Sequence, residues 1–326
     1  MTGNENPRLA IAVIIGTVFA LALGDALIKD ASATFTLWQI FVLRSVAVVP
    51  ILILLIRGRA VGVQLVPEDP FWTVVRSSLL TLMWITYYLS LAHVELSIAA
   101  AAYYTLPLFI TLFAATFLGD SIGSIGWFAV VMGFAGVVLI LEPRVSDFNW
   151  YAVLPLVSAV LYALAMILTR SRCRREHMFV LSLWLNLTML AAGATATLVL
   201  VALELPLAMV AAQEFLLGSW STLGFNEWAA LAVLSATMII GSVGAAYAYQ
   251  NGRPSTIATF DFAYVAFAMA WGMIVFGEEP TSKGVAGVTL IVVAGILAVR
   301  SSNRRAQAAE QGVAADVPPA SRLGRG

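Results

Sequence analysis

The sequence is poor in the residues that form disulfides or bind metals, since it has two histidines and one cysteine among 326 residues. A single cysteine excludes a disulfide within the chain, and so few thiols and imidazoles argue against a metal site. Cys173 lies among arginines in a short loop, where we expect a free thiol in a reducing compartment. We therefore expect no metal and no cofactor.

Charged residues are also scarce. They make up 11% of the chain, against 61% hydrophobic residues, whereas a soluble domain carries about 25% charged residues. Most of the surface must therefore contact something other than water, and we expect the lipid bilayer to be the main partner. Basic and acidic residues are equal in number, 18 of each, so the net charge gives no reason to expect a nucleic-acid partner.

Long apolar runs dominate what is present. A helix needs about 20 apolar residues to span a bilayer, and the chain shows ten candidates: 8–29, 34–56, 71–92, 96–118, 123–141, 150–169, 178–203, 227–250, 254–276 and 282–299. The first run lacks a small-residue cleavage site, so we expect it to be a span and not a cleaved signal. Within the long loop 204–226, the stretch QEFLLGSW is a candidate interfacial helix. Residues 300–326 are expected to form a disordered cytoplasmic tail.

The distribution of basic residues predicts the orientation. If the N-terminus is inside, thirteen of the 18 basic residues lie in cytoplasmic segments and three lie outside. Arg44 and Arg76 lie within helices, and Arg76 is expected to extend towards the inner interface. Cytoplasmic loops collect Lys and Arg, so we expect a multi-pass protein of the plasma membrane, a bacterial inner membrane, with both termini cytoplasmic.

The chain contains a weak internal repeat. The stretch 97–141 returns at 255–299 without a gap, and the turn that joins its two apolar helices is conserved between the copies: Gly119 aligns with Gly277, Asp120 with Glu278, Ser124 with Ser282 and Gly126 with Gly284. Ten spans divide into five plus five, and because five is odd the second half enters the membrane from the opposite side. The prediction is an all-α membrane protein of two inverted repeats, 8–141 and 150–299.

Charged residues inside predicted spans mark candidate functional positions. Arg44 lies near the middle of its span, where a charge costs roughly 2.5–3.5 kcal/mol on insertion scales, so we expect its side chain to be shielded from lipid. It either contacts a solute or carboxylate in a cavity, or clamps the bundle structurally. Asp261 is a candidate proton carrier or a partner for a buried arginine. Asp25 either faces a cavity or pairs with Lys29 four residues later.

Aromatic and small residues complete the candidate positions. Tyr103 and Tyr104 follow an alanine run and precede Pro107, so they either line a pocket or bond to neighbouring helices. Glycines of the fifth and tenth spans are expected to form a packing surface. This surface could be a dimer contact, but we favour a contact between the two halves of one chain. The expected solute-binding residues are Arg44, Trp84, Tyr103, Tyr104, Asp261, Tyr264 and Trp271, and the candidates for proton coupling are Asp25 and Asp261.

The repeat, the topology and the turns resemble the EamA branch of the drug/metabolite transporter superfamily over residues 9–299. The resemblance rests on LRS at 43–45, TLP at 105–107, LGD at 118–120 and FGEE at 276–279. Asp120 replaces the usual Glu, and Val265 stands where the first repeat has Pro107. The resemblance implies a central cavity lined by helices one, three, four, six, eight and nine.

These features are compatible with three classes of function. The leading hypothesis is a secondary transporter, monomeric or homodimeric, that moves a small polar or amphipathic metabolite by alternating access, such as riboflavin or an amino acid. An exporter of drugs or other metabolites is the alternative. No nucleotide-binding loop occurs, so ATP-driven transport would need a partner. The second hypothesis is an intramembrane enzyme, but no hydrolase motif occurs, so we expect no enzyme. A non-transporting membrane protein is the third hypothesis.

Overall fold

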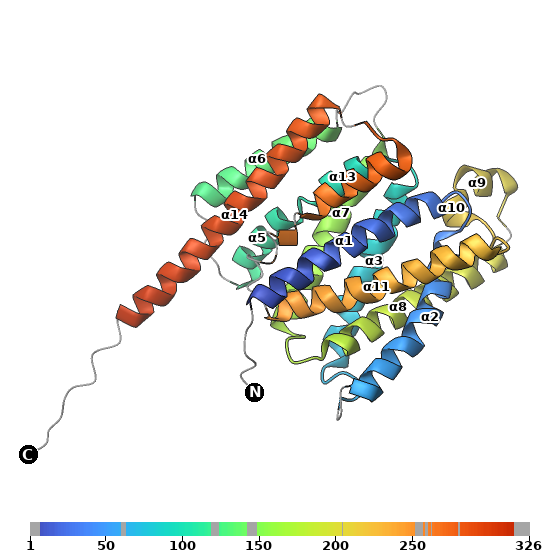
Figure 1. Cartoon of the computed structure of the whole chain (residues 1–326), viewed down its shortest axis with the longest axis horizontal. Coiled ribbons are helices and arrows are strands. Elements are labelled where there is room, and N and C mark those ends of the chain that lie inside the picture. The colour runs from blue at the N-terminus through green and yellow to red at the C-terminus, as the bar shows by residue number, and fades with distance from the viewer. Residues whose placement is uncertain are drawn as a thin grey trace, which may run out of the picture.

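A computed structural model describes residues 7–59, 63–118, 124–141, 149–203, 205–251, 257, 260, 261, 263–279 and 281–315. All regular structure in this part of the chain is helical, and Figure 1 shows most of the helices packed side by side. The helices are α1 (Pro7–Ala31), α2 (Leu37–Arg59), α3 (Pro70–Leu91), α4 (Leu96–Tyr103), α5 (Leu106–Leu118), α6 (Ser124–Leu141), η1 (Trp150–Val153), α7 (Leu154–Ser171), α8 (Met178–Leu203), α9 (Leu207–Ala212), α10 (Glu214–Leu217), α11 (Phe225–Asn251), α13 (Ala263–Phe276) and α14 (Ser282–Ala315).

Six helices of the described chain are long and apolar enough to cross a membrane. They match the predicted spans one, two, three, six, seven and eight: Arg8–Ala31, Leu37–Gly58, Pro70–Leu91, Trp150–Ser171, Met178–Leu203 and Phe225–Asn251. Shorter apolar helices stand at the other four predicted spans. The turn predicted at Gly119 and Asp120 lies outside the described residues.

The last helix is longer than the sequence predicts. Helix α14 continues beyond residue 299 to Ala315, into the segment expected to be a disordered tail. This extension is rich in Ala, Arg and Gln, which favour helices. Residues that lack an apolar face can still lengthen a helix that already exists, because the costly nucleation step has been made. Residues 316–326 lie outside the described chain.

The predicted fourth span is interrupted in its middle. Helix α4 ends at Tyr103 and α5 begins at Leu106. At the break, the Thr105 side chain donates a hydrogen bond to the Ala102 carbonyl at 2.8 Å. Pro107 has no N–H to continue the helical pattern, so the chain restarts as a new helix. The break leaves Tyr103 and Tyr104 buried in the interior of the bundle.

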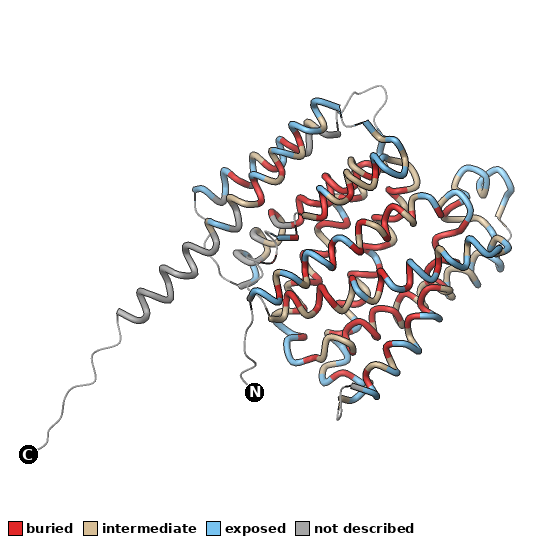
Figure 2. The backbone as a smooth tube through the Cα atoms, in the orientation of Figure 1, coloured by how far each residue is buried: buried red, intermediate tan, exposed pale blue. Residues whose placement is uncertain are grey.

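Buried and exposed residues divide by helix face. Figure 2 shows buried residues where helices meet and exposed residues on the outer surfaces. Many of the exposed side chains are large and apolar, including Leu54, Leu198 and Ile274. An apolar outer surface of this extent is unfavourable in water. It is the surface expected of helices that contact lipid chains.

The long loop folds back onto the bundle. Of the predicted interfacial stretch QEFLLGSW, only Glu214–Leu217 is helical, as α10. Phe215 is buried there, and the Trp38 indole of α2 donates to the Leu216 carbonyl at 2.8 Å. Gln39 exchanges hydrogen bonds with Ser221, donating to its carbonyl at 2.9 Å and accepting from its N–H at 3.1 Å. The loop is therefore anchored to α2.

Helices α6 and α14, the last of each predicted repeat, pack against each other at one edge of the molecule (Figure 1). A Cβ added at Gly136 of α6 would lie 2.8 Å from the Gly287 carbonyl oxygen of α14. Such a short distance means that the two backbones are in direct contact, which only small residues permit. The predicted glycine seam between the two halves is confirmed at this contact.

The seam predicts the effect of a single methyl group. We expect Gly136→Ala to destabilise the protein by roughly 1–3 kcal/mol, because the added carbon meets backbone that cannot turn away. Gly16→Ala is the matched control, since nothing lies within 4 Å of a Cβ at that helical position. Thermal unfolding in detergent measures both variants. Equal midpoints would show that the two helices are not held in tight contact.

Candidate functional site

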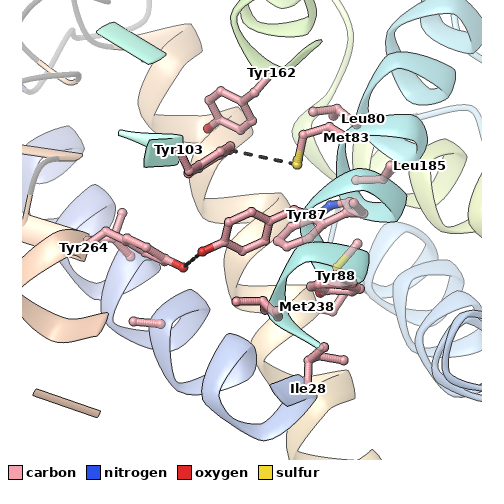
Figure 3. Packing of buried hydrophobic residues seen from close by; sticks show 14 of the residues in the cluster. Ile28, Leu80, Met83, Tyr87, Tyr88, Tyr103, Tyr162, Leu185, Met238 and Tyr264 are labelled. Atoms are coloured by element: carbon pink, nitrogen blue, oxygen red, sulfur yellow. Dashed lines mark hydrogen bonds between the residues drawn. The ribbon is translucent and has the colours of Figure 1, made fainter. Parts of the chain in front are cut away.

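Two buried carboxylates lie at the centre of the bundle. Asp25 of α1 is 2% exposed and Asp261, just before α13, is 3% exposed. The Tyr264 hydroxyl donates a hydrogen bond to Asp25, and the Tyr87 and Tyr264 hydroxyls are 2.7 Å apart (Figure 3). A hydroxyl has one proton to donate, so Tyr87 donates to Tyr264. The result is a directed chain from α3 through α13 to α1.

Asp261 has its own pair of tyrosines. The Tyr104 hydroxyl donates to one carboxylate oxygen at 3.2 Å, and the Tyr249 hydroxyl donates to the other at 2.7 Å. Tyr104 begins the break between α4 and α5, and Tyr249 belongs to α11. Buried carboxylates need such donors, because an unpaired buried charge is costly. Asp261 thus joins elements from both halves of the chain.

A stacked tyrosine pair connects the two carboxylates. The rings of Tyr104 and Tyr264 lie 4.8 Å apart at 17°, while their hydroxyls bond to Asp261 and Asp25 respectively. Tyr103 packs edge-on against Tyr104 at 5.5 Å and against Tyr162 at 5.9 Å. Figure 3 shows Tyr87, Tyr103, Tyr162 and Tyr264 converging on one region of the core.

These side chains enclose a small cavity of about 30 Å³. A site of that size has room for about one water molecule and none for a metabolite. The conformation is therefore closed around its polar centre. The lining residues are Leu21, Asp25, Trp84, Tyr87, Tyr103, Tyr104, Leu106, Tyr162, Asp261 and Tyr264.

The structure brings together six of the eight residues singled out in the sequence. Asp25, Trp84, Tyr103, Tyr104, Asp261 and Tyr264 line the cavity. Trp271 does not, and its ring packs 6.0 Å from the Phe19 ring instead. Asp25 bonds to Tyr264, and its predicted alternative partner, Lys29, contacts the Val94 carbonyl and Glu278.

Arg44 lies one layer behind the cavity. It is 2% exposed, and it donates to the Tyr88 hydroxyl at 3.0 Å and to the Met189 sulfur at 3.7 Å. The Tyr88 ring in turn packs 4.9 Å from the ring of Trp84, which lines the cavity. Arg44 therefore reaches the site through Tyr88, and it lines no part of the present cavity.

The expected position of Arg76 is wrong. It is buried between helices and does not extend to the interface: its Nε donates to the Thr169 hydroxyl at 2.6 Å, and Nη1 lies 3.5 Å from the Leu181 carbonyl. Neighbouring Cys173 is a free, buried cysteine. Burial raises the pKa of its thiol, although the nearby charge of Arg76 acts in the opposite direction.

Three site tyrosines were not assigned from the sequence. Tyr87 is one of several aromatic residues in its span, and Tyr249 lies at the end of its predicted span, 227–250. Tyr162 stands in an apolar stretch without a distinguishing neighbour. Tyr249 bonds to Asp261, Tyr87 bonds to Tyr264, and Tyr162 lines the cavity. These contacts depend on how α3, α7 and α11 pack, so no local sequence signal could have found them.

A second, larger pocket lies at the end of the bundle where α3 begins and α7 and α11 end. Its volume is about 750 Å³, which falls in the size range of small-molecule sites, about 300–1,000 Å³. Burial lowers the pKa of its His177, which favours the neutral imidazole. The lining is largely polar: Val63, Gln64, Val66, Glu68, Arg175, Glu176, His177, Met178, Val180, Tyr247, Gln250 and Asn251.

Comparison with known families agrees with these features. Residues 8–142 match the model of the EamA-like transporter family, so the resemblance found in the sequence is confirmed over this part of the chain. With the apolar helices described above, this match makes the chain a multi-pass membrane protein.

Three curated relatives are named as transporters. The pseudopaline exporter CntI of Pseudomonas aeruginosa is 28% identical over 87% of this chain and 93% of its own. The riboflavin transporter of Rhizobium johnstonii is 29% identical over 66% of this chain and 65% of its own. The S-adenosylmethionine uptake transporter of Rickettsia bellii is 25% identical over 72% of this chain and 74% of its own. The relatives are thus transporters and not enzymes.

A solved crystal structure shares the fold. It superposes with a TM-score of 0.63 at 18% identity, covering 91% of this chain and 99% of the other. This likeness supports the helical architecture over almost the whole chain, and at this identity it carries nothing about the solute.

Proposed function

We propose that this protein is a secondary transporter that moves a small polar or amphipathic organic solute across the membrane by alternating access. Two inverted five-helix repeats, 8–141 and 150–299, surround the path, and both termini are cytoplasmic. The observation that carries the proposal is the closed polar centre, where Asp25 and Asp261 meet tyrosines from both halves of the chain. Ionisable groups buried at membrane depth mark transport pathways.

The walls of the centre favour an aromatic or heteroaromatic solute, such as riboflavin or an aromatic amino acid. Trp84, Tyr103, Tyr104 and Tyr264 would present ring faces to a planar group, and stacked or edge-on ring pairs are stabilising beyond their buried area. The carboxylates would accept hydrogen bonds from an amine or hydroxyl of the same solute. Arg44 would act from behind through Tyr88.

The closed cavity represents one state of the proposed cycle. A volume of about 30 Å³ must grow many-fold before a metabolite can enter. The break at Tyr104 and Thr105 is the position where α4 can move relative to α5, because the helical hydrogen bonds are interrupted there. The pocket of about 750 Å³ where α3 begins would then serve as the vestibule on the cytoplasmic side.

Asp25 and Asp261 would couple transport to protons. An ionised Asp25 accepts from Tyr264, whereas a protonated Asp25 can donate to it, and Tyr264 would then donate to Tyr87. Protonation therefore reverses the direction of the whole hydroxyl chain. A solute and a proton that compete for the same carboxylate would occupy the site in turn.

Counterflow in liposomes tests the proposal. Purified protein is reconstituted into vesicles loaded with unlabelled riboflavin or an aromatic amino acid, and labelled solute is added outside. We expect saturable accumulation of label that protein-free vesicles do not show. A panel of aromatic, heteroaromatic and amphipathic solutes that gives no flux would favour the non-transporting alternative.

The direction of transport is a separate question. A relative that aligns with 87% of this chain is named as an exporter, which supports the alternative that this protein exports drugs or other metabolites. Flux measured in cells and in inverted vesicles, each with the same imposed proton gradient, separates export from uptake.

A further inference from the structure

The feature that the proposed function leaves unused is Glu278, at the end of the bundle opposite the large pocket. Helix α13 stops at Phe276, and Gly277 adopts a left-handed conformation with φ of +64°. Its N–H donates to the Met273 carbonyl at 3.2 Å, a helix ending that favours glycine. The chain then turns back, so that the Glu278 N–H donates to the Gly272 carbonyl at 3.2 Å.

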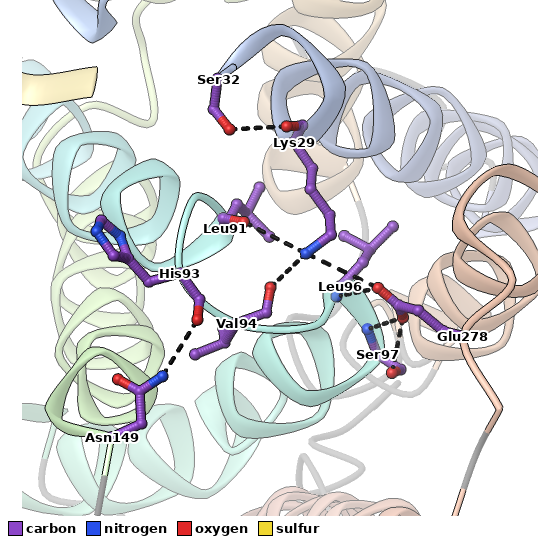
Figure 4. Close-up of polar contacts among 9 residues, drawn as sticks. All are labelled: Lys29, Ser32, Leu91, His93, Val94, Leu96, Ser97, Asn149 and Glu278. Atoms are coloured by element: carbon purple, nitrogen blue, oxygen red, sulfur yellow. Dashed lines mark hydrogen bonds and ion pairs between the residues drawn. The ribbon is translucent and has the colours of Figure 1, made fainter. Parts of the chain in front are cut away.

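This turn directs the Glu278 carboxylate onto the start of α4 (Figure 4). One carboxylate oxygen accepts from the Leu96 N–H at 2.8 Å, and the other accepts from the Ser97 N–H at 3.2 Å and the Ser97 hydroxyl at 2.9 Å. The local N-cap residue, Glu95, makes no side-chain capping bond. The first N–H groups of a helix need an acceptor, and here it comes from a residue 182 positions away.

Lys29 completes the cluster from α1. Its Nζ lies 3.8 Å from Glu278 Oε1 and donates to the Val94 carbonyl at 2.5 Å. Both side chains are mostly buried. A cluster of four residues, Lys29, Leu96, Ser97 and Glu278, thus ties α1, α4 and α13 together, and we call it the Glu278 latch.

The three helices that the latch joins are those that carry the polar centre. Asp25 lies on α1 one turn before Lys29, Tyr264 belongs to α13, and Tyr103 ends α4. Helix α4 is eight residues long, about 12 Å at 1.5 Å per residue, so its capped start and its tyrosine end move as one short rigid unit.

We propose that Glu278 is a positioning residue, which caps α4 across the two halves of the chain and holds the central cavity closed at this end. Release of the carboxylate frees the start of α4 from α1 and α13, and Tyr103 and Tyr104 then swing away from Asp25 and Tyr264. The inference deepens the proposed function, because this end is the external gate of the same solute path.

Accessibility of a cavity thiol tests the latch without any solute. Cys173 is the single native cysteine, so Cys173→Ser gives a background without thiols. Leu106→Cys then places a reporter at a buried position of the cavity lining. A membrane-impermeant thiol reagent is added to intact cells, and in parallel to inverted vesicles, to probe the two membrane faces separately.

Glu278→Gln is the first test variant, and Gly272→Ala is the second. A Cβ at Gly272 would lie 2.5 Å from Glu278 Oε2, so this change displaces the carboxylate and keeps its charge. Glu279→Gln is the matched control, since Glu279 is the exposed neighbour. We expect the thiol of both test variants to react about tenfold faster than that of the control. A hydrogen bond to a charged group changes an equilibrium constant by at least this factor, so its loss should raise the population of the open cavity correspondingly. The labelling rate should increase only when the reagent is added on the side of the membrane where α1 ends.

Two results would overturn the latch. One is labelling as slow as in the Glu279→Gln control while the unfolded protein reacts fully. The other is faster labelling from both faces, which would mean that Glu278 merely stabilises the fold. If the protein shows counterflow but labelling is unchanged in the test variants, the latch is rejected and the transport function stands. If labelling is faster from one side only but no solute flux is found, the latch stands and the transport function is rejected.

Discussion

Replacing Asp261 by asparagine is expected to reduce solute flux strongly while leaving the protein folded in the membrane. Asparagine has the same shape, but it carries no charge and cannot take up a proton. The hydrogen bonds from Tyr104 and Tyr249 would lose their charged acceptor. We expect a loss of about ten- to hundredfold, because a hydrogen bond to a charged group contributes roughly 1.5–3 kcal/mol and each 1.4 kcal/mol is a factor of ten.

The measurement is flux in proteoliposomes with and without an imposed proton gradient. Tyr249→Phe is the matched control, since it removes one donor and keeps the carboxylate, and it should lose less flux and keep its response to the gradient. Asp25→Asn, tested in parallel, shows which carboxylate carries the proton. The proton-carrying carboxylate is the one whose replacement by asparagine leaves counterflow intact but abolishes gradient-driven accumulation. Normal flux and normal coupling in Asp261→Asn would remove Asp261 from the mechanism.

Replacing Arg44 by alanine is expected to abolish transport without preventing insertion. The guanidinium holds the Tyr88 hydroxyl and contacts the faces of Phe41 and Tyr88 at 5.7 Å. Its loss would leave a void and a buried hydroxyl without its donor, and Trp84, which packs on Tyr88, would lose its support. Displacement of a positioning contact can cost about a hundredfold in rate.

Flux per folded molecule, together with the thermal midpoint, separates a transport role from a structural one. Arg57→Ala is the matched control because Arg57 lies on the same helix and is exposed. We expect Arg57→Ala to resemble the unmodified protein in both measurements. If Arg44→Ala unfolds at a lower temperature but transports normally per folded molecule, Arg44 is a structural clamp only.

The helices themselves could be predicted well from the sequence. The seventh predicted span, 178–203, coincides with α8, since apolar composition alone decides where a chain can cross lipid. The break near Pro107 also follows from a local rule, the missing N–H of proline. The extension of α14 could not be foreseen, because helix formers without an apolar face give no periodic signal.

The site could be predicted only in part, because it depends on which helices meet. Asp25, Asp261 and Tyr104 stand out as polar residues within apolar runs, and they do line one cavity. Their partners do not stand out: Tyr264 is 239 residues from Asp25, and Tyr104 is 157 residues from Asp261. Arg76 illustrates the same limit, since only the packing of α7 against α3 provides Thr169 as its acceptor.

The contact between Gly136 and Gly287 restricts how the two halves of the chain can move. Where backbone touches backbone, no flexible side chain can take up a displacement. Sliding or separation would break the contact along the length of α6 and α14, whereas a small rotation about it keeps the backbones touching. This helix pair is therefore suited to act as a pivot, with the widest travel at the helices farthest from it.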